Sequence, residues 1–406
     1  MALRAREMPT VGLVTVGHFF SHFYFLVLPP LFPLLRNEFG LSNAELGLLI
    51  SVMSVGMLLQ VPIGALVDRI GAKWILVIGM ALTSLGILLI GVATSYLLMV
   101  AFATLSGVGQ SAFHPADYPL LEAVSDEDRL GRNFGVHTFG GYAGSTIAPL
   151  LVGGIGFTAG WRPALITVGA TGVIFAVVLA VALAPAYLQQ VNDATSKPSR
   201  DVRASRRSPF GLAILVMAAF FVVITMAEMG VQTFTPLLAL DGFQFSETIG
   251  NMALSAFFGL TAVGVLVGGL LADRFEPRYI ILGATTLAGT TVLVVVAGVV
   301  SMDPAVFVLA FAITGTGFGL VFASRDRLVS SYTAAGSTGT SFGFVFTASS
   351  VGALASPLFL GIVIDFVSTG VAFTFVGVFF LLSGFIVLLV GGAPPIARLR
   401  SRFRTG

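Results

Sequence analysis

The chain contains no cysteine, little charge and only two tryptophans in 406 residues. The absence of cysteine excludes disulfides, thiolate metal sites and cysteine nucleophiles. Charged residues make up 10% of the chain, against about 25% in soluble domains. So little charge cannot cover the surface of a water-soluble globule of this size. Most of the surface must therefore face lipid.

Hydrophobic residues make up 56% of the chain and gather in runs of about 20 residues, the length that crosses a hydrocarbon core of about 30 Å. The pattern predicts an all-α membrane protein with twelve transmembrane helices. The predicted spans are residues 11–35, 44–67, 74–94, 96–121, 133–158, 162–184, 210–240, 248–272, 278–300, 304–329, 338–366 and 370–392.

Two similar segments show that the chain is internally duplicated. VPIGALVDRIGAK covers residues 61–73 and LVGGLLADRFEPR covers residues 266–278, which places Asp68 and Asp273 205 residues apart. At an offset of 208, Phe134-Gly135 matches Phe342-Gly343. A repeated pattern of this kind is typical of transporter halves. We expect an N-terminal six-helix bundle over residues 1–186, a cytoplasmic linker over 187–208 and a C-terminal bundle over 209–406.

The positions of Lys and Arg predict the orientation in the membrane. With the N-terminus in the cytoplasm, every Lys and Arg except Arg36 and Arg162 falls on the cytoplasmic side. Cytoplasmic loops carry such an excess of basic residues. We therefore expect both termini in the cytoplasm. The local excess of basic residues therefore indicates membrane topology and not a nucleic-acid partner.

The segment GALVDRIGAK resembles the loop motif G-x-x-x-D-R-x-G-x-K/R of the major facilitator superfamily. The matching residues are Gly64, Asp68, Arg69, Gly71 and Lys73 in the first copy, and Gly269, Asp273, Arg274 and Arg278 in the second, where Glu276 replaces the second glycine. The resemblance implies two pseudo-symmetric six-helix bundles that rock about a central cavity. Asp68 and Asp273 would bind the N-terminal ends of adjacent helices in one state, a contact worth about 0–1 kcal/mol.

A narrower resemblance concerns bacterial exporters. The stretch SHFYFLVLPPLFPLLRNEFGLS, the run AFHPAD at 112–117 and span five resemble the fosmidomycin-resistance branch. Span five also resembles an antiporter motif through Gly144, Pro149, Gly153 and Gly154, although Ala148 stands where that motif has glycine. The resemblance implies export across the inner membrane of a prokaryote.

Ionisable residues inside spans are costly and usually face a cavity or a partner. His18 and His22 lie one turn apart in span one, and Glu228 lies near the middle of span seven with Gln232 one turn later. The histidines are either structural or a proton or substrate site, because His titrates near neutrality. Two histidines are not a complete ligand set, even with an oxygen from Glu228, so we expect no metal. Glu228 has no cation along its own helix, which suits a proton carrier.

A third group lies in spans four, five and ten. His114 and Asp117 share one helical face, His137 lies one turn into span five, and Asp117 corresponds to Arg325 at offset 208. An Asp117–Arg325 bridge would close the cytoplasmic side in the outward-open state. Arg325, Asp326 and Arg327 cannot share one face, so some of them would reach the cytoplasm. The alternative reading of this group is anchoring at the membrane interface.

Taken together, the residues predict a monomeric secondary transporter, with proton-coupled efflux of a small organic or drug-like molecule favoured over uptake or facilitated diffusion of an organic anion or metabolite. Glu228, His22 and His18 are the proton-coupling candidates. The candidate substrate contacts are His18, His22, Gln232, His114, Phe19 and Phe23. No nucleophile elbow, metal motif or phosphate loop occurs, so we expect neither an enzyme nor a cofactor. A non-transporting membrane sensor is the remote alternative.

Overall fold

The computed structural model describes residues 2–183, 211–298, 303–333 and 338–390. Within these ranges the chain is helical and contains no strand. Twelve helical segments are long and apolar enough to cross a membrane, which confirms the predicted number of spans. The expected linker over residues 187–208 lies outside the described ranges.

The first half of the chain forms six membrane-spanning segments, three of which are interrupted. Its elements are α1 (Ala2–Phe25), η1 (Pro29–Leu31), α2 (Phe32–Phe39), α3 (Asn43–Met53), η2 (Ser54–Leu59), α4 (Gln60–Ile70), α5 (Ala72–Val92), α6 (Tyr96–Gln110), α7 (Phe113–Val124), α8 (Glu127–Ala159) and α9 (Trp161–Ala182). The second half has longer helices. These are α11 (Leu212–Leu237), η4 (Leu238–Gly242), α12 (Glu247–Ala272), α13 (Pro277–Val296), α14 (Pro304–Tyr332), α15 (Thr338–Phe366) and α16 (Thr369–Leu388).

Span one is confirmed as a membrane-crossing segment, but its helix is interrupted. Helix α1 ends at Phe25, and the chain continues through η1 into α2. Pro29, Pro30 and Pro33 lie in this stretch and lack the N–H that a continuous helix needs. Span two likewise passes from α3 through η2 to α4, and span four breaks between α6 and α7. Run length predicts that a segment spans the membrane but not where its helix is interrupted.

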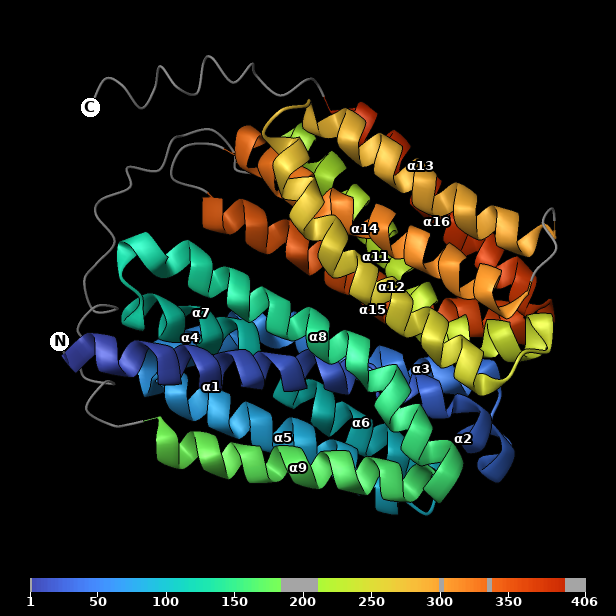
Figure 1. The fold of residues 1–406 in the computed structure, drawn as a ribbon, viewed down its shortest axis with the longest axis horizontal. Helices are drawn as coiled ribbons and strands as arrows, with labels where there is room; N and C mark the ends of the chain where they lie inside the picture. The colour runs from blue at the N-terminus through green and yellow to red at the C-terminus, as the bar shows by residue number, and fades with distance from the viewer. Residues whose placement is uncertain (1, 184–210, 299–302, 334–337, 391–406) are drawn as a thin grey trace.

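The helices form two bundles, with α1–α9 in one and α11–α16 in the other (Figure 1). They meet where α8 packs against α12 and where α3 packs against α15. Each bundle has its own buried side chains, such as Tyr24 and Phe113 in the first and Phe257 and Phe318 in the second. The site described below lies where these two bundles face each other.

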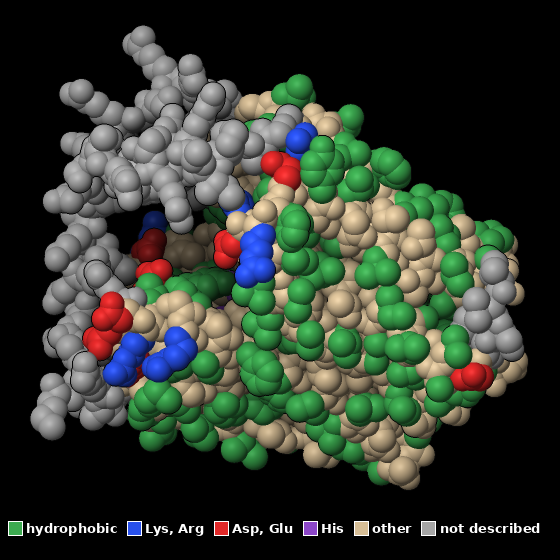
Figure 2. Space-filling view, turned by 45° about the horizontal axis from the view of Figure 1, so that its top comes forward, with side chains coloured by type: hydrophobic (Ala, Val, Ile, Leu, Met, Phe, Trp, Pro, Cys, Tyr) green, Lys and Arg blue, Asp and Glu red, His purple; other side chains and the backbone are tan. Residues whose placement is uncertain are grey.

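The bundles touch at one end and separate at the other. We call the end at which α1 begins the N-terminal face. Near the opposite face, a Cβ added to Gly47 of α3 would lie 2.2 Å from the carbonyl oxygen of Pro357 in α15. Near the N-terminal face, Gly343 of α15 has nothing within 4 Å, and α4 packs against α5 and α7 of its own bundle. Figure 2 shows a recess at this face that contains acidic and basic side chains.

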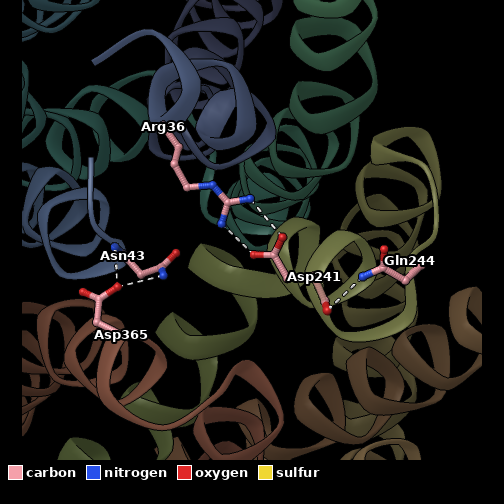
Figure 3. A network of polar contacts seen from close by, with 5 residues as sticks. All are labelled: Arg36, Asn43, Asp241, Gln244 and Asp365. Atoms are coloured by element: carbon pink, nitrogen blue, oxygen red, sulfur yellow. Dashed lines mark hydrogen bonds and ion pairs between the residues drawn. The ribbon is translucent and has the colours of Figure 1, made fainter. Parts of the chain in front are cut away.

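Two ionic contacts join the bundles at the opposite face (Figure 3). Arg36 donates hydrogen bonds of 2.6 and 2.9 Å to the two carboxylate oxygens of Asp241. Asp365, at the end of α15, accepts 2.8 Å hydrogen bonds from the backbone N–H groups of Asn43 and Ala44. A carboxylate at a helix N-terminus is favoured by the helix dipole. These contacts hold the opposite face closed in this conformation.

Candidate functional site

All four histidines of the chain meet in the interior of the N-terminal bundle. His18 and His22 come from α1, His114 from α7 and His137 from α8. The His18 ring is stacked on His137 with centroids 3.8 Å apart, and it lies 4.6 Å from His22 and 5.2 Å from His114. Gly141 leaves room for the rings to meet, because a Cβ at this position would lie only 2.8 Å from Nε2 of His18. We call these four residues and Asp117 the histidine cluster.

Asp117 is the acidic member of the histidine cluster and is completely buried. Its Oδ2 lies 3.1 Å from Nε2 of His137 and 3.4 Å from Nδ1 of His18. His18 and His137 are only 4% and 1% exposed. A carboxylate removed from water to this degree needs close polar or cationic partners, and the two rings supply them.

The histidine cluster has an inner and an outer layer. His18, Asp117 and His137 are buried, whereas His22 and His114 are partly exposed. The outer layer is bordered by tyrosines: Tyr118 stacks on His114, and Tyr142 lies 6.3 Å from His22. The Tyr142 ring also contacts Phe322 of α14 in the other bundle. The outer histidines therefore lie on the side of the bundle that faces its partner.

The C-terminal bundle places Glu228 and Arg325 on the facing wall. Glu228 of α11 is half-buried and lies within electrostatic range of Arg325 of α14 and of Tyr142 of α8. The Arg325 guanidinium lies 4.0 Å from the Phe322 ring centroid and 5.0 Å from that of Phe221. Such stacking holds an arginine in a fixed orientation, and the N–H groups of Arg325 beyond the one that binds Asp326 can still donate to a ligand.

The three charged residues of span ten point in different directions, as expected from their helical spacing. Arg325 lies towards Phe322 and contacts Oδ1 of Asp326 at 3.3 Å, and Asp326 has a half-exposed carboxylate. Arg327 donates to the backbone oxygen of Ala272 at the end of α12. The structure does not bring Asp117 and Arg325 together, so their bridge in the other conformation stays a prediction.

The two loop motifs contain equivalent basic residues that bind equivalent helix ends. Lys73, only 3% exposed, donates to the backbone oxygen of Leu183 just after α9. Arg278, its counterpart in the second half, donates to the backbone oxygen of Val390 just after α16 at 3.1 Å. A cation at a helix C-terminus satisfies orphan carbonyls and opposes the dipole. Each motif thus ties the third span of its bundle to the sixth.

The remaining motif residues differ between the copies. Gly71 separates α4 from α5 with φ of 87°, a backbone conformation that glycine adopts readily. Glu276, in the second copy, precedes Pro277 with φ of −64° and needs no glycine. Asp68, Arg69, Asp273 and Arg274 are exposed, and Gly64 and Gly269 have no close neighbour. In this conformation no described residue forms a salt bridge with either aspartate.

Residues of the antiporter-like motif and the other predicted contacts lie at helix interfaces. A Cβ on Gly144 would lie 2.2 Å from the Phe19 oxygen, and one on Gly153 would meet Asn251 of the other bundle, whereas Gly154 has open space beside it. Pro149 lies inside α8. Gln232 is buried and donates to the Phe25 oxygen across the bundles at 3.4 Å. Phe23 is buried against Phe19, Phe20 and Tyr24.

Sequence reasoning missed the Arg36–Asp241 pair and Tyr142. The pair had a detectable signal, because its members are 205 residues apart, the same offset that relates Asp68 to Asp273. Opposite charges at the repeat offset indicate a contact between equivalent positions of the two halves. Tyr142 had no comparable signal, since it is one aromatic residue among many in the spans.

The fold and site define a multi-pass membrane protein whose two six-helix bundles enclose a polar centre. The chain belongs to the Major Facilitator Superfamily, because the model of that family matches residues 14–250 and 220–406. This finding confirms the resemblance seen in the loop motifs.

Several curated proteins are similar to the chain. The fosmidomycin resistance protein of Escherichia coli is 24% identical over 68% of this chain and 67% of its own length. The uncharacterized transporter YfnC of Bacillus subtilis is 22% identical over 92% of this chain and 90% of its own. The probable nitrate/nitrite transporter NarK2 of Mycobacterium tuberculosis is 29% identical over 83% of this chain and 84% of its own.

Among solved structures, the chain resembles a bacterial homologue of the human lysosomal transporter Spinster in an inward-facing and occupied conformation. The TM-score is 0.72 at 14% identity, and the match covers 94% of each chain. This likeness supports the two-bundle fold.

Proposed function

We propose that this transporter exports a small organic molecule in exchange for protons by alternating access. The observation that carries the proposal is a half-buried carboxylate, Glu228, within electrostatic range of Arg325 in its own bundle and of Tyr142 in the other. A half-buried carboxylate inside the membrane is costly unless it has a role or a partner. Glu228 gains or loses a proton as the bundles rock. The positive charge of Arg325 attracts Glu228 when its carboxylate is ionised and not when it is protonated.

Protonation of Glu228 depends on the groups around it. Among the described residues, Arg325 of α14 and Tyr142 of α8 are the titratable groups that act on it. On α15, Ser349 and Ser356 hydrogen-bond to the Thr225 side chain and the Met226 oxygen, so that neighbouring helix presents neutral groups. His18 and His22, the other coupling candidates, lie in the histidine cluster of the N-terminal bundle. We therefore assign the coupling proton to Glu228.

The proposed orientation places the N-terminal face in the cytoplasm of a prokaryotic cell, with both termini there and the protein acting as a monomer in the inner membrane. Arg36 and Arg162, the two basic residues assigned to the outside, support this orientation. Arg36 pairs with Asp241, and Arg162 pairs with Glu38. Both pairs lie at the face opposite the start of α1. With this orientation, the conformation described here is open to the cytoplasm, where an exporter collects its substrate.

The direct test is transport in proteoliposomes with and without a pH gradient. A fluorescent or radiolabelled organic compound, first selected by a thermal-shift screen, should move against its gradient only when a proton gradient of the correct polarity is present. Unchanged flux after the gradient is collapsed with an ionophore would rule out proton coupling. Similarity to a fosmidomycin resistance protein makes fosmidomycin the first compound to screen.

Uptake or facilitated diffusion of an organic anion or metabolite is the second candidate. It is favoured by the stacked guanidinium of Arg325, which suits an anionic group, and by similarity to nitrate and galactonate transporters. Direction separates the two candidates. Cells that express an exporter accumulate less substrate than cells without it, and cells that express an importer accumulate more.

A further inference from the structure

We propose that His18, Asp117 and His137 bind one divalent transition-metal ion of the zinc class inside the N-terminal bundle. The proposal does not depend on the direction or coupling of transport. It uses three side chains from three helices, α1, α7 and α8, which the sequence places far apart. The sequence alone offered only two histidines of one helix, which is why no metal was expected.

The spacing of the three side chains fits a small metal ion. One ligand atom from each lies within 4.8 Å of the other two. Oδ2 of Asp117 lies 3.1 Å from Nε2 of His137 and 3.4 Å from Nδ1 of His18. Zinc binds nitrogen and carboxylate oxygen at about 2.0–2.2 Å, so two ligands of a tetrahedral ion are separated by about 3.4 Å. The two short separations match those of neighbouring ligands around one ion. To bind it, the stacked His18 and His137 rings turn so that both nitrogen lone pairs point at the ion, which replaces the His137–Asp117 hydrogen bond.

Unsatisfied polar atoms provide a second, independent observation. Nδ1 of His18 and Oδ1 of Asp117 are buried and form no hydrogen bond with the described residues, although Nδ1 of His18 lies 3.4 Å from Oδ2 of Asp117. Nδ1 of His114, in the outer layer, is likewise buried and forms no hydrogen bond with the described residues. Such orphaned groups are rare in folded proteins because each costs about 1–3 kcal/mol. A metal ion would remove the cost at His18 by accepting its nitrogen lone pair and would balance the buried charge of Asp117.

The chemistry of the donors selects the class of ion. Two imidazoles and one carboxylate suit zinc and its first-row neighbours better than magnesium or calcium, which prefer oxygen. Three protein ligands leave a fourth position for water, which is typical of sites that exchange ligands with solvent. The triad itself is buried, whereas His22 and His114 beside it are partly exposed.

All three ligands belong to one bundle, which indicates that the ion is resident and not cargo. Alternating access moves the two bundles relative to each other and leaves contacts within each bundle intact. A metal held by α1, α7 and α8 stays bound through the cycle and fixes the wall that faces Glu228 and Arg325. Zinc entry into proteoliposomes above that of empty vesicles would contradict this assignment.

Metal content of the purified full-length chain tests the site directly. The protein is prepared in detergent with a tag that contains no histidine, stripped with a chelator, dialysed against zinc and measured by mass spectrometry. We expect one zinc per chain. Replacing zinc with cobalt should give the visible absorption of a tetrahedral ion. The absence of bound zinc above a protein-free blank would overturn the proposal.

Matched variants locate the ion. Asp117→Asn and His137→Gln should each weaken zinc binding by at least about tenfold, since losing even an outer-shell partner costs about 10- to 100-fold. His22→Gln is the control, because its Nδ1 faces the Ser145 hydroxyl and lies outside the triad. Equal zinc content in all three variants would overturn the assignment to these residues.

Thermal melting of the unmodified chain covers the case in which a variant does not fold. An ion that binds only the folded state raises the melting temperature with increasing concentration. Zinc should stabilise the unmodified protein and the His22→Gln variant to a similar degree, whereas magnesium should stabilise neither. A melting temperature of the unmodified chain that zinc does not raise would count against the site.

Discussion

Arg36 and Asp241 occupy equivalent positions in the two halves of the chain and bind each other. They are 205 residues apart, the offset that also relates Asp68 to Asp273. The pair therefore joins the two bundles at the face where they meet.

Breaking this pair should shift the protein away from the conformation described here. The side chains are 27% and 31% exposed, so Arg36→Gln should cost about 1 kcal/mol, which corresponds to about a fivefold change in the ratio of the two states. Because the chain has no cysteine, labels at Glu122→Cys and Ser330→Cys would be the only two. Double electron–electron resonance between spin labels at these two cysteines measures the distance across the N-terminal face. In Arg36→Gln it should show more short distances, because that face closes.

Arg162→Gln is the matched control for Arg36→Gln. Arg162 pairs with Glu38 at the same face with similar exposure, but both residues belong to the N-terminal bundle. Its loss should leave the distance distribution unchanged. Swapping the charges of Arg36 and Asp241 together should restore the original distribution, and an unrestored swap would argue against a direct role of the pair.

Gly47→Ala should oppose closure of the same face by steric means. The added methyl would lie 2.2 Å from the Pro357 oxygen in the other bundle, so the bundles must separate there to accommodate it. We expect the same loss of the conformation that is open at the N-terminal face in the resonance experiment. Gly154→Ala is the control, because its methyl enters open space and alanine favours a helix by about 1 kcal/mol. Equal behaviour of the two variants would contradict the proposed contact.

Lys73→Met should lower stability without acting through the central cavity. The buried ammonium binds the Leu183 oxygen, and losing a hydrogen bond to a charged group costs about 1–3 kcal/mol. The thermal melting temperature in detergent should fall. Arg69→Gln, an exposed change in the same motif, should leave it unchanged. A Lys73→Met protein as stable as the parent would show that the carbonyl contact contributes nothing.

Glu228→Gln should separate transport from its proton gradient. The amide has almost the same shape but cannot carry a proton, so substrate binding and downhill exchange should survive while uphill transport is lost. Flux in proteoliposomes with and without a pH gradient measures both. Glu122→Gln, an exposed carboxylate at the end of α7, should remain gradient-driven. Gradient-driven transport by Glu228→Gln would move the coupling proton to another residue.

The sequence predicted the spans and the duplication well, because both depend on local hydropathy and on repeat offsets. It also placed His18 beside His22, and His114 beside Asp117, because helical spacing determines those neighbours. It grouped His137 with His114 and Asp117, but it could not bring His18 and His22 to the same place. That meeting depends on how α1, α7 and α8 pack within one bundle, and the repeat offset relates only one half to the other.

The sequence analysis also did not predict the helix interruptions or the contacts made at helix ends. The binding of Lys73 to the Leu183 oxygen joins residues 110 positions apart, through a backbone atom that carries no sequence signal. The divergence of Glu276 from the motif glycine was visible, but its reason was not. The structure supplies the reason, since a second-half helix that begins at Pro277 needs no left-handed residue before it.

The histidine cluster makes the duplicated halves chemically unequal. At offset 208, His114 corresponds to Phe322, Asp117 to Arg325 and His137 to Val345, so the second half has two apolar side chains and a cation in place of two imidazoles and an acid. Two copies of one ancestral unit have therefore specialised. A saturation mutagenesis screen that selects for the metal-loaded fold should show this difference, with low tolerance at the cluster positions and different permitted residues at their counterparts.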